Sequence, residues 1–260
     1  MNLDLSGKIA LVCGSTQGLG YASAVELALL GCNVVLLARN EERLKTALQS
    51  LPNTNQHHSY LLADFTDTAA VKAAVTTLTK TNTVHILVNN TGGPAGGPAL
   101  TADTSEFLQA FNNHLVNNHN LVQAVVPGMK AAGFGRIVNI ISTSVKIPLA
   151  GLGVSNTIRG AVASWAKTLA TELGPFGITV NNVLPGFTKT SRADYVIGKK
   201  AADTGKTEAE VMKSLEAEIP AGRIGRPEEF GAAVAFLCSP AAAYINGINL
   251  PVDGGRLGCL

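Results

Sequence analysis

Residues 9–20 read IALVCGSTQGLG and join a short apolar run to a glycine-rich turn. The run at residues 9–13 is continuous in hydrophobicity, which is typical of a strand covered on both faces of a sheet. Gly14, Gly18 and Gly20 follow it, where the backbone must approach a ligand closely and where the next helix must pack against the sheet. Free N–H groups and the positive dipole end at the start of that helix favour a pyrophosphate. The stretch therefore predicts a dinucleotide site on the first strand–helix crossover.

The rest of the chain repeats this alternation of short apolar runs and longer amphipathic stretches. Predicted strands cover residues 9–13, 34–38, 60–63, 86–89, 136–141, 179–184 and 248–252. Predicted helices cover residues 18–30, 41–51, 68–80, 104–130, 154–173 and 227–237. The alternation implies right-handed crossovers. We therefore expect an α/β fold, a single Rossmann-type domain over residues 1–260 with a doubly wound parallel sheet of about seven strands and helices on both faces.

Two segments interrupt this rhythm. Residues 91–99 read TGGPAGGPA and form a Gly/Pro loop after the fourth predicted strand. Residues 191–219 follow the sixth predicted strand and are more polar. This insertion resembles a lid or substrate loop, and a plain surface helix is the alternative. Because sheets of this kind bind ligands at the carboxyl ends of their strands, both segments lie where a ligand is expected.

The composition argues against nucleic acids and membranes as binding partners. Hydrophobic residues make up 46% of the chain and charged residues 15%, so most of it is expected to be packed structure. The net charge is +2 and no Lys/Arg cluster stands out, which argues against a nucleic-acid surface. The first residues lack the pattern of a signal peptide, and no apolar run reaches the roughly 20 residues of a membrane span. We expect a cytoplasmic protein that does not engage a membrane.

The four cysteines give no sign of a disulfide or a metal site. They are Cys13, Cys32, Cys238 and Cys259, and none forms a C-x-x-C pair. Reduced structural thiols are the better interpretation, and no metal is expected.

Further motifs follow the glycine turn in a fixed order. They are NNTG at residues 89–92, Pro185-Gly186, RIGRPEE at residues 223–229 and VDGG at residues 252–255. Together with the spacing G-x-x-x-G-x-G at residues 14–20, they resemble the short-chain dehydrogenase/reductase family over essentially the whole chain. The resemblance implies an oxidoreductase that interconverts a carbonyl and an alcohol, similar to 3-oxoacyl-acyl-carrier-protein reductases. The alternative is a structural α/β domain that binds no nucleotide.

The choice of cofactor depends on the end of the second predicted strand. A carboxylate there would accept hydrogen bonds from the ribose hydroxyls and select NAD. Ala38 occupies that place and Arg39 follows it. A guanidinium pairs with a 2′-phosphate through two parallel hydrogen bonds, so we expect NADP(H), with NAD(H) as the alternative. The competing interpretation of Arg39 is an exposed loop arginine.

By the same resemblance, residues along five strand ends bind the cofactor. Asp64 is expected to hold the adenine amino group, with Phe65 beside it, although Asp64 could instead cap the following helix. The remaining cofactor residues are expected to be Gly14, Ser15, Thr16, Gln17, Gly18, Leu19, Gly20, Asn90, Gly92, Arg159, Pro185, Gly186, Thr188 and Thr190.

The catalytic positions depart from the family pattern. The family carries an Asn, a Ser and a Tyr-x-x-x-Lys pair. Here Ser142 stands on the serine position, Ser155 on the tyrosine, Arg159 on the lysine and His114 on the asparagine, with Asn113 adjacent. The resemblance therefore implies an intact cofactor site beside an altered catalytic set.

Physical chemistry limits what this set does. Ser155 is a far weaker acid than a phenol and reaches less far, and Arg159 supplies charge and ribose hydrogen bonds without relaying protons. His114 is a candidate proton source because an unperturbed imidazole has a pKa near 6.5. Alternatively, His114 is a satisfied helix histidine and Ser155 caps the turn after Gly153. Tyr195, in the insertion, is a further candidate acid.

Two classes of function fit these residues. The first is an NADP(H)-dependent reductase of a small-molecule carbonyl or alcohol, and the second is a catalytically silent dinucleotide-binding regulator or scaffold. A hydrolase is discounted because no G-x-S-x-G elbow or clustered nucleophile is present. By the resemblance we expect a homotetramer or homodimer packed through residues 104–130 and 154–173 and the last strand.

Overall fold

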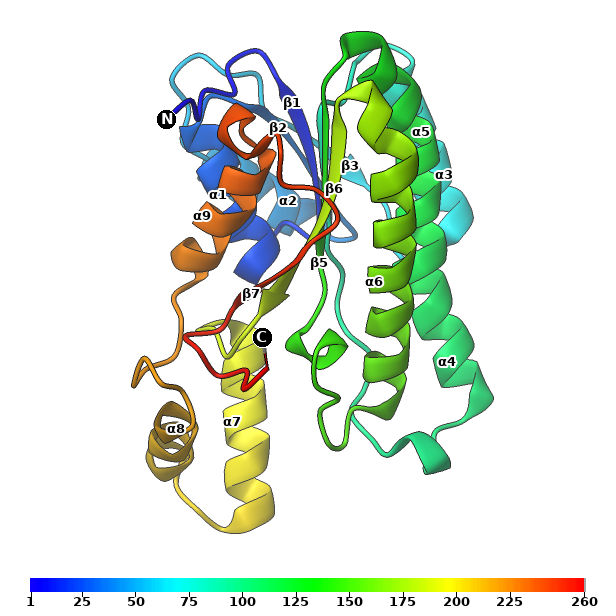
Figure 1. Cartoon of the computed structure of the whole chain (residues 1–260). Helices are drawn as coiled ribbons and strands as arrows, with labels where there is room; N and C mark the ends of the chain where they lie inside the picture. Colours follow the sequence, from blue (N-terminus) through cyan, green and yellow to red (C-terminus); the bar gives the residue numbers. More distant parts are fainter. Residues whose placement is uncertain (260) are drawn as a thin grey trace.

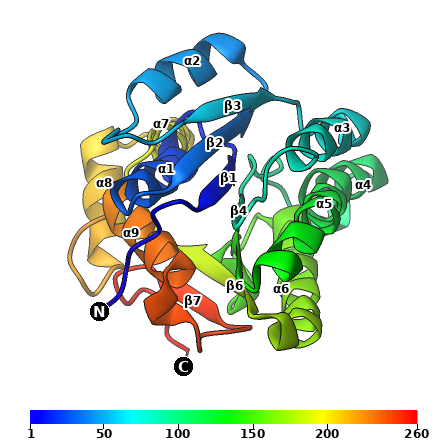
Figure 2. The same cartoon turned by 90° about the horizontal axis from the view of Figure 1, so that it is seen from above.

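The computed structural model describes residues 1–259 as a three-layer α/β fold around one sheet (Figures 1 and 2). All strand pairs are parallel, in the order β3-β2-β1-β4-β5-β6-β7. The strands are β1 Ile9–Cys13, β2 Asn33–Ala38, β3 Ser59–Leu62, β4 Ile86–Asn89, β5 Gly135–Ile140, β6 Ile178–Pro185 and β7 Asn249–Val252. The helices are α1 Gly18–Leu29, α2 Glu41–Gln49, α3 Thr68–Thr79, α4 Thr104–Phe111, α5 Asn117–Ala132, α6 Gly153–Leu173, α7 Ser191–Thr204, α8 Glu208–Ala217 and α9 Pro227–Cys238. The expected doubly wound parallel sheet is confirmed.

Two apolar cores hold the helices to the two faces of the sheet. On one face α1, α2 and α9 pack on the strands around Leu27, Leu44 and Phe230. On the other face α3, α5 and α6 pack around Met129 and Ala166. Figure 2 shows the helix layers on either side of the sheet. The central strands β1, β2 and β4 read as apolar runs because both of their faces are covered, whereas the edge strands β3 and β7 are only partly buried.

One predicted helix is divided in the structure. The sequence predicts a single helix over residues 104–130, whereas α4 and α5 are joined by a π-helical segment, Asn112–Val116. A π-helical turn changes the angle at which side chains leave the helix and is frequent at functional sites. Apolar periodicity does not reveal such a segment, because the helical pattern continues through it.

The insertion after β6 is a helical hairpin rather than an irregular loop. Gly205 has a left-handed backbone (φ +66°) that ends α7, and a capping box between Thr207 and Glu210 starts α8. A small apolar cluster that includes Ile197 and Leu215 joins the two helices. The hairpin extends beyond the carboxyl ends of the strands, at the bottom of Figure 1.

The four cysteines are free thiols, and Cys259 is the exposed one among them. Cys13, Cys32 and Cys238 are buried, and burial raises the pKa of Cys13 and of Cys32 to about 12. Within residues 1–259, no helix has the length and apolar character needed to cross a bilayer.

A row of asparagines, three of them buried and one half-buried, crosses four neighbouring strands. Asn89, Asn139, Asn182 and Asn249 are register partners on β4, β5, β6 and β7. Each side-chain amide donates to the next, over 2.8 Å, 2.9 Å and 2.8 Å. Because buried amides must be paired, this asparagine row favours one register of the four strands over any slipped alternative.

We predict that Asn139→Leu lowers the free energy of unfolding by about 2–4 kcal/mol, because it leaves the Asn89 donor and the Asn182 acceptor unpaired. Urea denaturation measures the loss. Asn82→Leu, at an exposed site after α3, is the matched control and is expected to change stability by less than about 0.5 kcal/mol. Equal stability of the two variants would contradict a structural role for the row.

Candidate functional site

The turn after β1 is built so that only glycine fits at two of its positions. Gly14 has φ +57°, and a Cβ there would lie 2.7 Å from Asn90 Nδ2. A Cβ on Gly20 would collide with the carbonyl oxygen of Gly14. Helix α1 starts after Gln17 with no side chain capping it. Its first N–H groups are therefore available to a ligand, and this bare peptide cradle fits a pyrophosphate.

Neighbouring residues hold this turn in place. Ser15 is fully buried and its Oγ accepts a hydrogen bond from the Leu37 N–H of β2, at 3.0 Å. Asn90, directly after β4, donates its side-chain amide to the carbonyl oxygens of Cys13 and Gly14. Ser15 and Asn90 thus act here as supports of the backbone rather than as free side chains.

A cavity of about 580 Å³ runs from this cradle along the carboxyl ends of the strands to α6 and α7. Eleven of the expected cofactor residues line it: Gly14, Gln17, Gly18, Leu19, Asn90, Gly92, Arg159, Pro185, Gly186, Thr188 and Thr190. Lining residues that the sequence did not single out for cofactor binding are Thr91, Gly93, Ile140, Ile141, Phe187, Ser191, Arg192, Ala193, Tyr195 and Val196. Most of these flank predicted residues, so their place beside a strand end was the signal that could have found them.

Arg159 is buried in the wall of this cavity. Its side chain comes from α6, is 8% exposed, and donates from Nη1 to the Ile140 carbonyl oxygen at 3.1 Å. Burial lowers its pKa to about 10, so the guanidinium remains charged at neutral pH. The group therefore supplies a fixed positive charge.

His114 lies behind the same loop, in the π-helical segment. It is 2% exposed and hydrogen-bonded to the backbone of Gly92. Burial, together with the positive charge of Arg159, lowers the pKa of His114 to about 3. The expectation of an unperturbed imidazole is therefore wrong, because a neutral histidine at physiological pH has no readily released proton. His114 lines a second cavity of about 270 Å³, which shares Gly92 and Gly93 with the first.

The two serines stand apart from the cavity lining. Ser142 accepts a hydrogen bond from the Ser144 N–H at 3.1 Å and caps the short 3₁₀ turn Thr143–Val145. Ser155 lies within α6, whose N-cap is Leu152, so the alternative of Ser155 as a helix cap is wrong. One helical turn separates Ser155 from Arg159, which places both on the same face of α6.

Asn156 is a structural residue that the sequence did not single out. Its side chain both donates to the Leu149 carbonyl oxygen, at 2.8 Å, and accepts from the Leu149 N–H, at 3.4 Å. It thereby fixes the loop between β5 and α6, which carries Ser142. No motif in the sequence marks it.

Arg39 and Asp64 lie together at the ends of β2 and β3, outside the cavity lining. Arg39 Nη1 is 3.7 Å from Asp64 Oδ2, and the Arg39 side chain is 74% exposed. Asp64 accepts from the Thr66 N–H, whereas Asp67 caps α3, so the cap alternative for Asp64 is wrong. Phe65 is buried and its carbonyl accepts from Asn117 at 2.7 Å.

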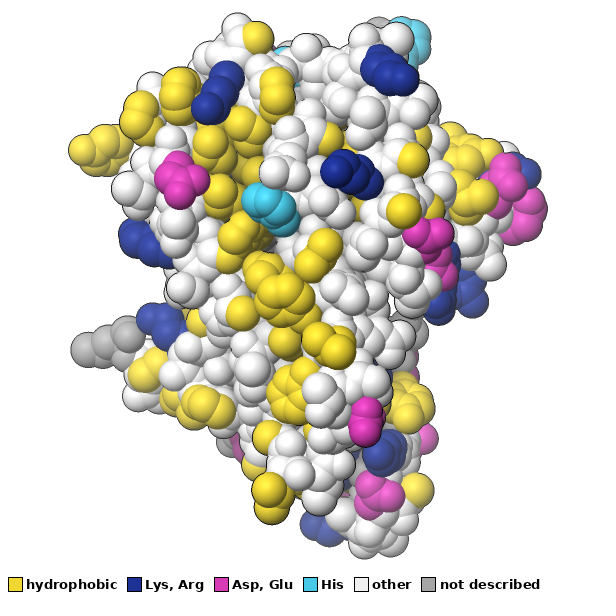
Figure 3. Space-filling view, turned by 90° about the vertical axis from the view of Figure 1, so that its right-hand side faces the viewer, with side chains coloured by type: hydrophobic (Ala, Val, Ile, Leu, Met, Phe, Trp, Pro, Cys, Tyr) yellow, Lys and Arg dark blue, Asp and Glu magenta, His cyan; other side chains and the backbone are white. Residues whose placement is uncertain are grey.

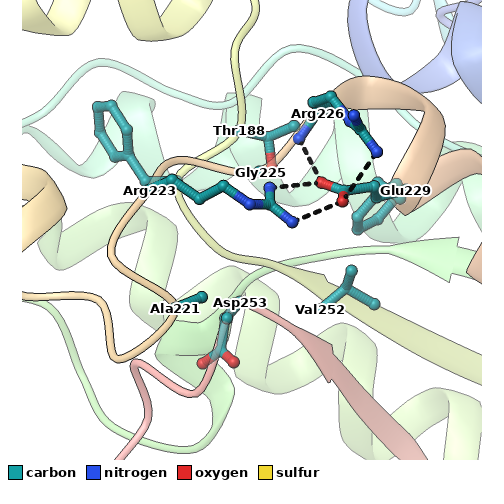
Figure 4. Close-up of a pocket in the computed structure, with 11 residues that line it drawn as sticks. Thr188, Ala221, Arg223, Gly225, Arg226, Glu229, Val252 and Asp253 are labelled. Atoms are coloured by element: carbon teal, nitrogen blue, oxygen red, sulfur yellow. Dashed lines mark hydrogen bonds and ion pairs between the residues drawn. The ribbon is translucent and has the colours of Figure 1, made fainter.

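A charged cluster fastens the loop that carries Thr188. Glu229 accepts two hydrogen bonds from Arg223, at 2.9 Å and 2.7 Å, and one from the backbone N–H of Arg226 at 2.8 Å (Figure 4). Gly225, between the two arginines, pairs with Thr188 in a short parallel bridge. We call this arrangement the Glu229 clamp. Thr188 lines both the main cavity and a cavity of about 200 Å³ beside the clamp, so the clamp positions one wall of the main cavity.

The site contains no recognisable metal centre within residues 1–259, because no group of three or more His, Cys, Asp or Glu side chains gathers there.

Comparisons with known proteins place the whole chain among reductases. A family model described as enoyl-(acyl carrier protein) reductase matches residues 14–256. A 3-oxoacyl-[acyl-carrier-protein] reductase of Vibrio cholerae is 33% identical over 253 residues, covering 97% of this chain and 98% of the relative. A chloroplastic tropinone reductase homologue of Arabidopsis thaliana is 33% identical over 254 residues, which cover 97% of this chain and 76% of the relative. The crystal structure of L-sorbose reductase from Gluconobacter frateurii, complexed with NADPH and L-sorbose, matches with a TM-score of 0.94, 31% identity and full coverage of both chains.

We predict that Glu229→Gln destabilises the protein at neutral pH but not in acid. Hydrogen bonds from Arg223 and the Arg226 backbone lower the pKa of Glu229 from 4.5 to about 2. The stabilisation is therefore present above about pH 4.5 and is lost as pH falls toward about 2. The difference in melting temperature between wild type and variant should be large at about pH 7 and narrow at about pH 3.

Glu228→Gln is the matched control, because this neighbour is exposed and lies outside the clamp. A difference for Glu229→Gln that does not change with pH would contradict the role of its carboxylate.

Proposed function

The chain belongs to the short-chain dehydrogenase/reductase family, and we propose on this basis that it is an NADP(H)-dependent oxidoreductase that interconverts a carbonyl and an alcohol. The observation that carries the proposal is one cavity whose lining includes both the bare glycine cradle and the buried Arg159. Solved relatives described as NADPH complexes share this fold across their full length. The resemblance to 3-oxoacyl-acyl-carrier-protein reductases supports this reaction type and leaves the substrate open.

In this proposal the dinucleotide lies across the strand ends. The amides of residues 14–20, including Thr16, hold the pyrophosphate, and Asn90 and Gly92 line the adenosine ribose. Pro185, Gly186, Thr188 and Thr190 frame the nicotinamide carboxamide, while Asp64 and Phe65 border the adenine. Each lies after a strand that reaches the same edge of the sheet, which is where doubly wound sheets bind ligands.

Arg39 is proposed to select NADP(H). Its side chain is 74% exposed, and the one ion pair it makes within residues 1–259 is the 3.7 Å contact with Asp64, so it can turn toward a 2′-phosphate. No carboxylate stands at Ala38, the position where an acid would favour NAD.

The cofactor would supply or accept a hydride at the reacting carbon. Residues of the chain stabilise the charge on the substrate oxygen and transfer the proton to or from it. Ser142 orients the carbonyl oxygen, and Arg159 adds a fixed positive charge and hydrogen bonds to the nicotinamide ribose. Because His114 is neutral, we assign it a hydrogen-bonding role at the Gly92 loop rather than proton donation. Ser155 is too weak an acid to give up a proton unaided, so it relays one between solvent and the substrate oxygen.

A catalytically silent dinucleotide-binding regulator or scaffold is the second candidate. The observation that favours it is the altered catalytic set, in which no phenol stands beside Arg159 and His114 is neutral. Binding without turnover would distinguish it from the first.

Assembly is proposed to use the face formed by α4, α5 and α6. Figure 3 shows hydrophobic side chains gathered on this side of the molecule. Leu108 and Phe111 on α4 are 61% and 39% exposed, and Trp165 on α6 is partly exposed. A homodimer or homotetramer packed through these helices would cover them.

We predict that the protein binds NADPH and oxidises it in the presence of small carbonyl compounds. Binding is measured by fluorescence titration, and turnover by the absorbance of NADPH against a panel of ketones, aldehydes and oxo acids. Gly20→Ala should abolish binding because its Cβ meets the Gly14 carbonyl, whereas Gly160→Ala, where a Cβ meets open space, should bind normally. Binding with no turnover favours the silent candidate, and the absence of binding rejects both.

We predict that Arg39→Ala weakens NADPH binding by about 10- to 100-fold, as expected for the loss of a guanidinium–phosphate contact. NADH binding should change little, since NADH has no 2′-phosphate. Lys72→Ala, on the exposed face of α3, is the control. An equal loss for the two coenzymes would show that Arg39 acts elsewhere.

A further inference from the structure

Arg159 is a buried charge without a counter-ion. Its one hydrogen bond within residues 1–259 is to the Ile140 carbonyl, and no described carboxylate forms an ion pair with it. A guanidinium carries five N–H donors, so most of this group's hydrogen-bonding capacity is unused. Because an unpaired buried charge is costly, a ligand that brings negative charge to this point would be strongly favoured.

The surrounding cavity supplies no negative charge either. Its ionised lining residues are Arg159 and Arg192, and no Asp or Glu lines it. The adjoining cavity has one carboxylate in its lining, that of the exposed Glu106. The Arg192 guanidinium lies over the Tyr195 ring, 5.5 Å from its centroid, near solvent. Arg159 is thus the deep cationic group of the cavity.

A dinucleotide pyrophosphate at the glycine cradle does not neutralise Arg159. The cradle follows β1, whereas Arg159 bonds to the end of β5, and β4 lies between these strands. Two strand spacings separate the two points by about 10 Å. A second negative group is therefore needed close to Arg159.

The free side of Arg159 faces the loop after β4. A Cβ added to Gly93 would lie 3.7 Å from Arg159 Nη2, so the guanidinium meets the backbone of that loop where the two cavities join. A planar guanidinium fork is the arrangement that binds a carboxylate through paired hydrogen bonds. Ser155 lies one turn earlier on the same face of α6 and lines neither cavity.

We propose that the substrate is an oxo acid and that Arg159 binds its carboxylate, which makes Arg159 the residue that determines specificity for an anionic substrate. The inference rests on the proposed reductase function and names its substrate class. The remaining guanidinium donors still allow contact with the cofactor ribose. A neutral ketone of the same size would leave the charge unpaired.

The test compares acids with their methyl esters, which share the reacting carbonyl and differ in charge. The probes are acetoacetate with methyl acetoacetate, and pyruvate with methyl pyruvate, each at saturating NADPH. We expect the wild type to favour the acid of at least one pair by about tenfold or more in kcat/KM, with the difference mainly in KM. Calorimetric binding of acetoacetate and pyruvate to the protein loaded with NADP⁺, which carries no hydride to transfer, provides a readout that needs no turnover.

Substitutions at Arg159 test whether this residue causes the preference for acids over esters. Arg159→Met should abolish both the preference and the calorimetric signal, and Arg159→Lys should retain part of each, because it keeps the charge without the fork. Lys72→Met should keep the full preference. The melting temperature and the far-UV circular dichroism spectrum establish that each variant is folded, and NADPH titration sets the saturating coenzyme concentration for each variant.

The inference is overturned if the wild type treats acid and ester alike, if no oxo acid binds to the NADP⁺-loaded protein, or if folded Arg159→Met keeps the preference. Reduction of a neutral ketone with no preference for acids would leave the proposed reductase standing and reject this substrate class. Failure of the wild type to bind NADPH would reject the reductase and, with it, the inference.

Discussion

The site depends on a steric constraint, the close approach of bare peptide backbone at the crossover from β1 to α1. Gly20 sits against the carbonyl of Gly14, and Gly14 sits against Asn90, so a side chain at either glycine would displace the turn. Asn90 belongs to the end of β4, and Ser15 is tied to β2. The cradle is therefore held by three neighbouring strands, and its shape follows from their register. The asparagine row extends that register across β5, β6 and β7 to the other half of the site.

The strands and the β1–α1 crossover could be predicted from the sequence, because each is determined by residues that are close together in the chain. Short apolar runs marked every strand, including the partly buried edge strands β3 and β7, with boundaries within a residue or two, and the glycine spacing marked the crossover. The hairpin of α7 and α8 left a signal that was overlooked, the pattern Thr207-x-x-Glu210, which forms a capping box. The division of the helix at residues 112–116 left no such signal. A π-helical turn is decided by packing against the rest of the fold, which the helical pattern of the segment does not encode.

The electrostatics of the site could not be predicted from residue types. His114 was expected to have the ordinary pKa of an imidazole, whereas burial and Arg159 lower it to about 3. The two residues are 45 positions apart in the chain, and their coupling arises because α6 and the π-helical segment meet beneath the Gly92 loop. Likewise, the position of Arg159 was evident from the motif, but the absence of a carboxylate around it, within the part of the chain that the structure describes, is a property of the assembled cavity.

The walls of the cofactor cavity and the residues at the catalytic positions are held in place by different interactions. The catalytic residues can therefore change while the cavity walls keep their structure. Thr188 belongs to the segment that leads into α7, and it is joined to Gly225 by a two-residue bridge. That bridge is held by the Glu229 clamp, where several hydrogen bonds converge on one partly exposed carboxylate. An isolated surface ion pair contributes little, but a bidentate pair reinforced by a backbone N–H fixes geometry. Neither the clamp nor the asparagine row contacts Ser142, Ser155 or His114 through any hydrogen bond between the described residues. The residues at the reacting end can therefore be exchanged without loosening the walls that would hold a dinucleotide.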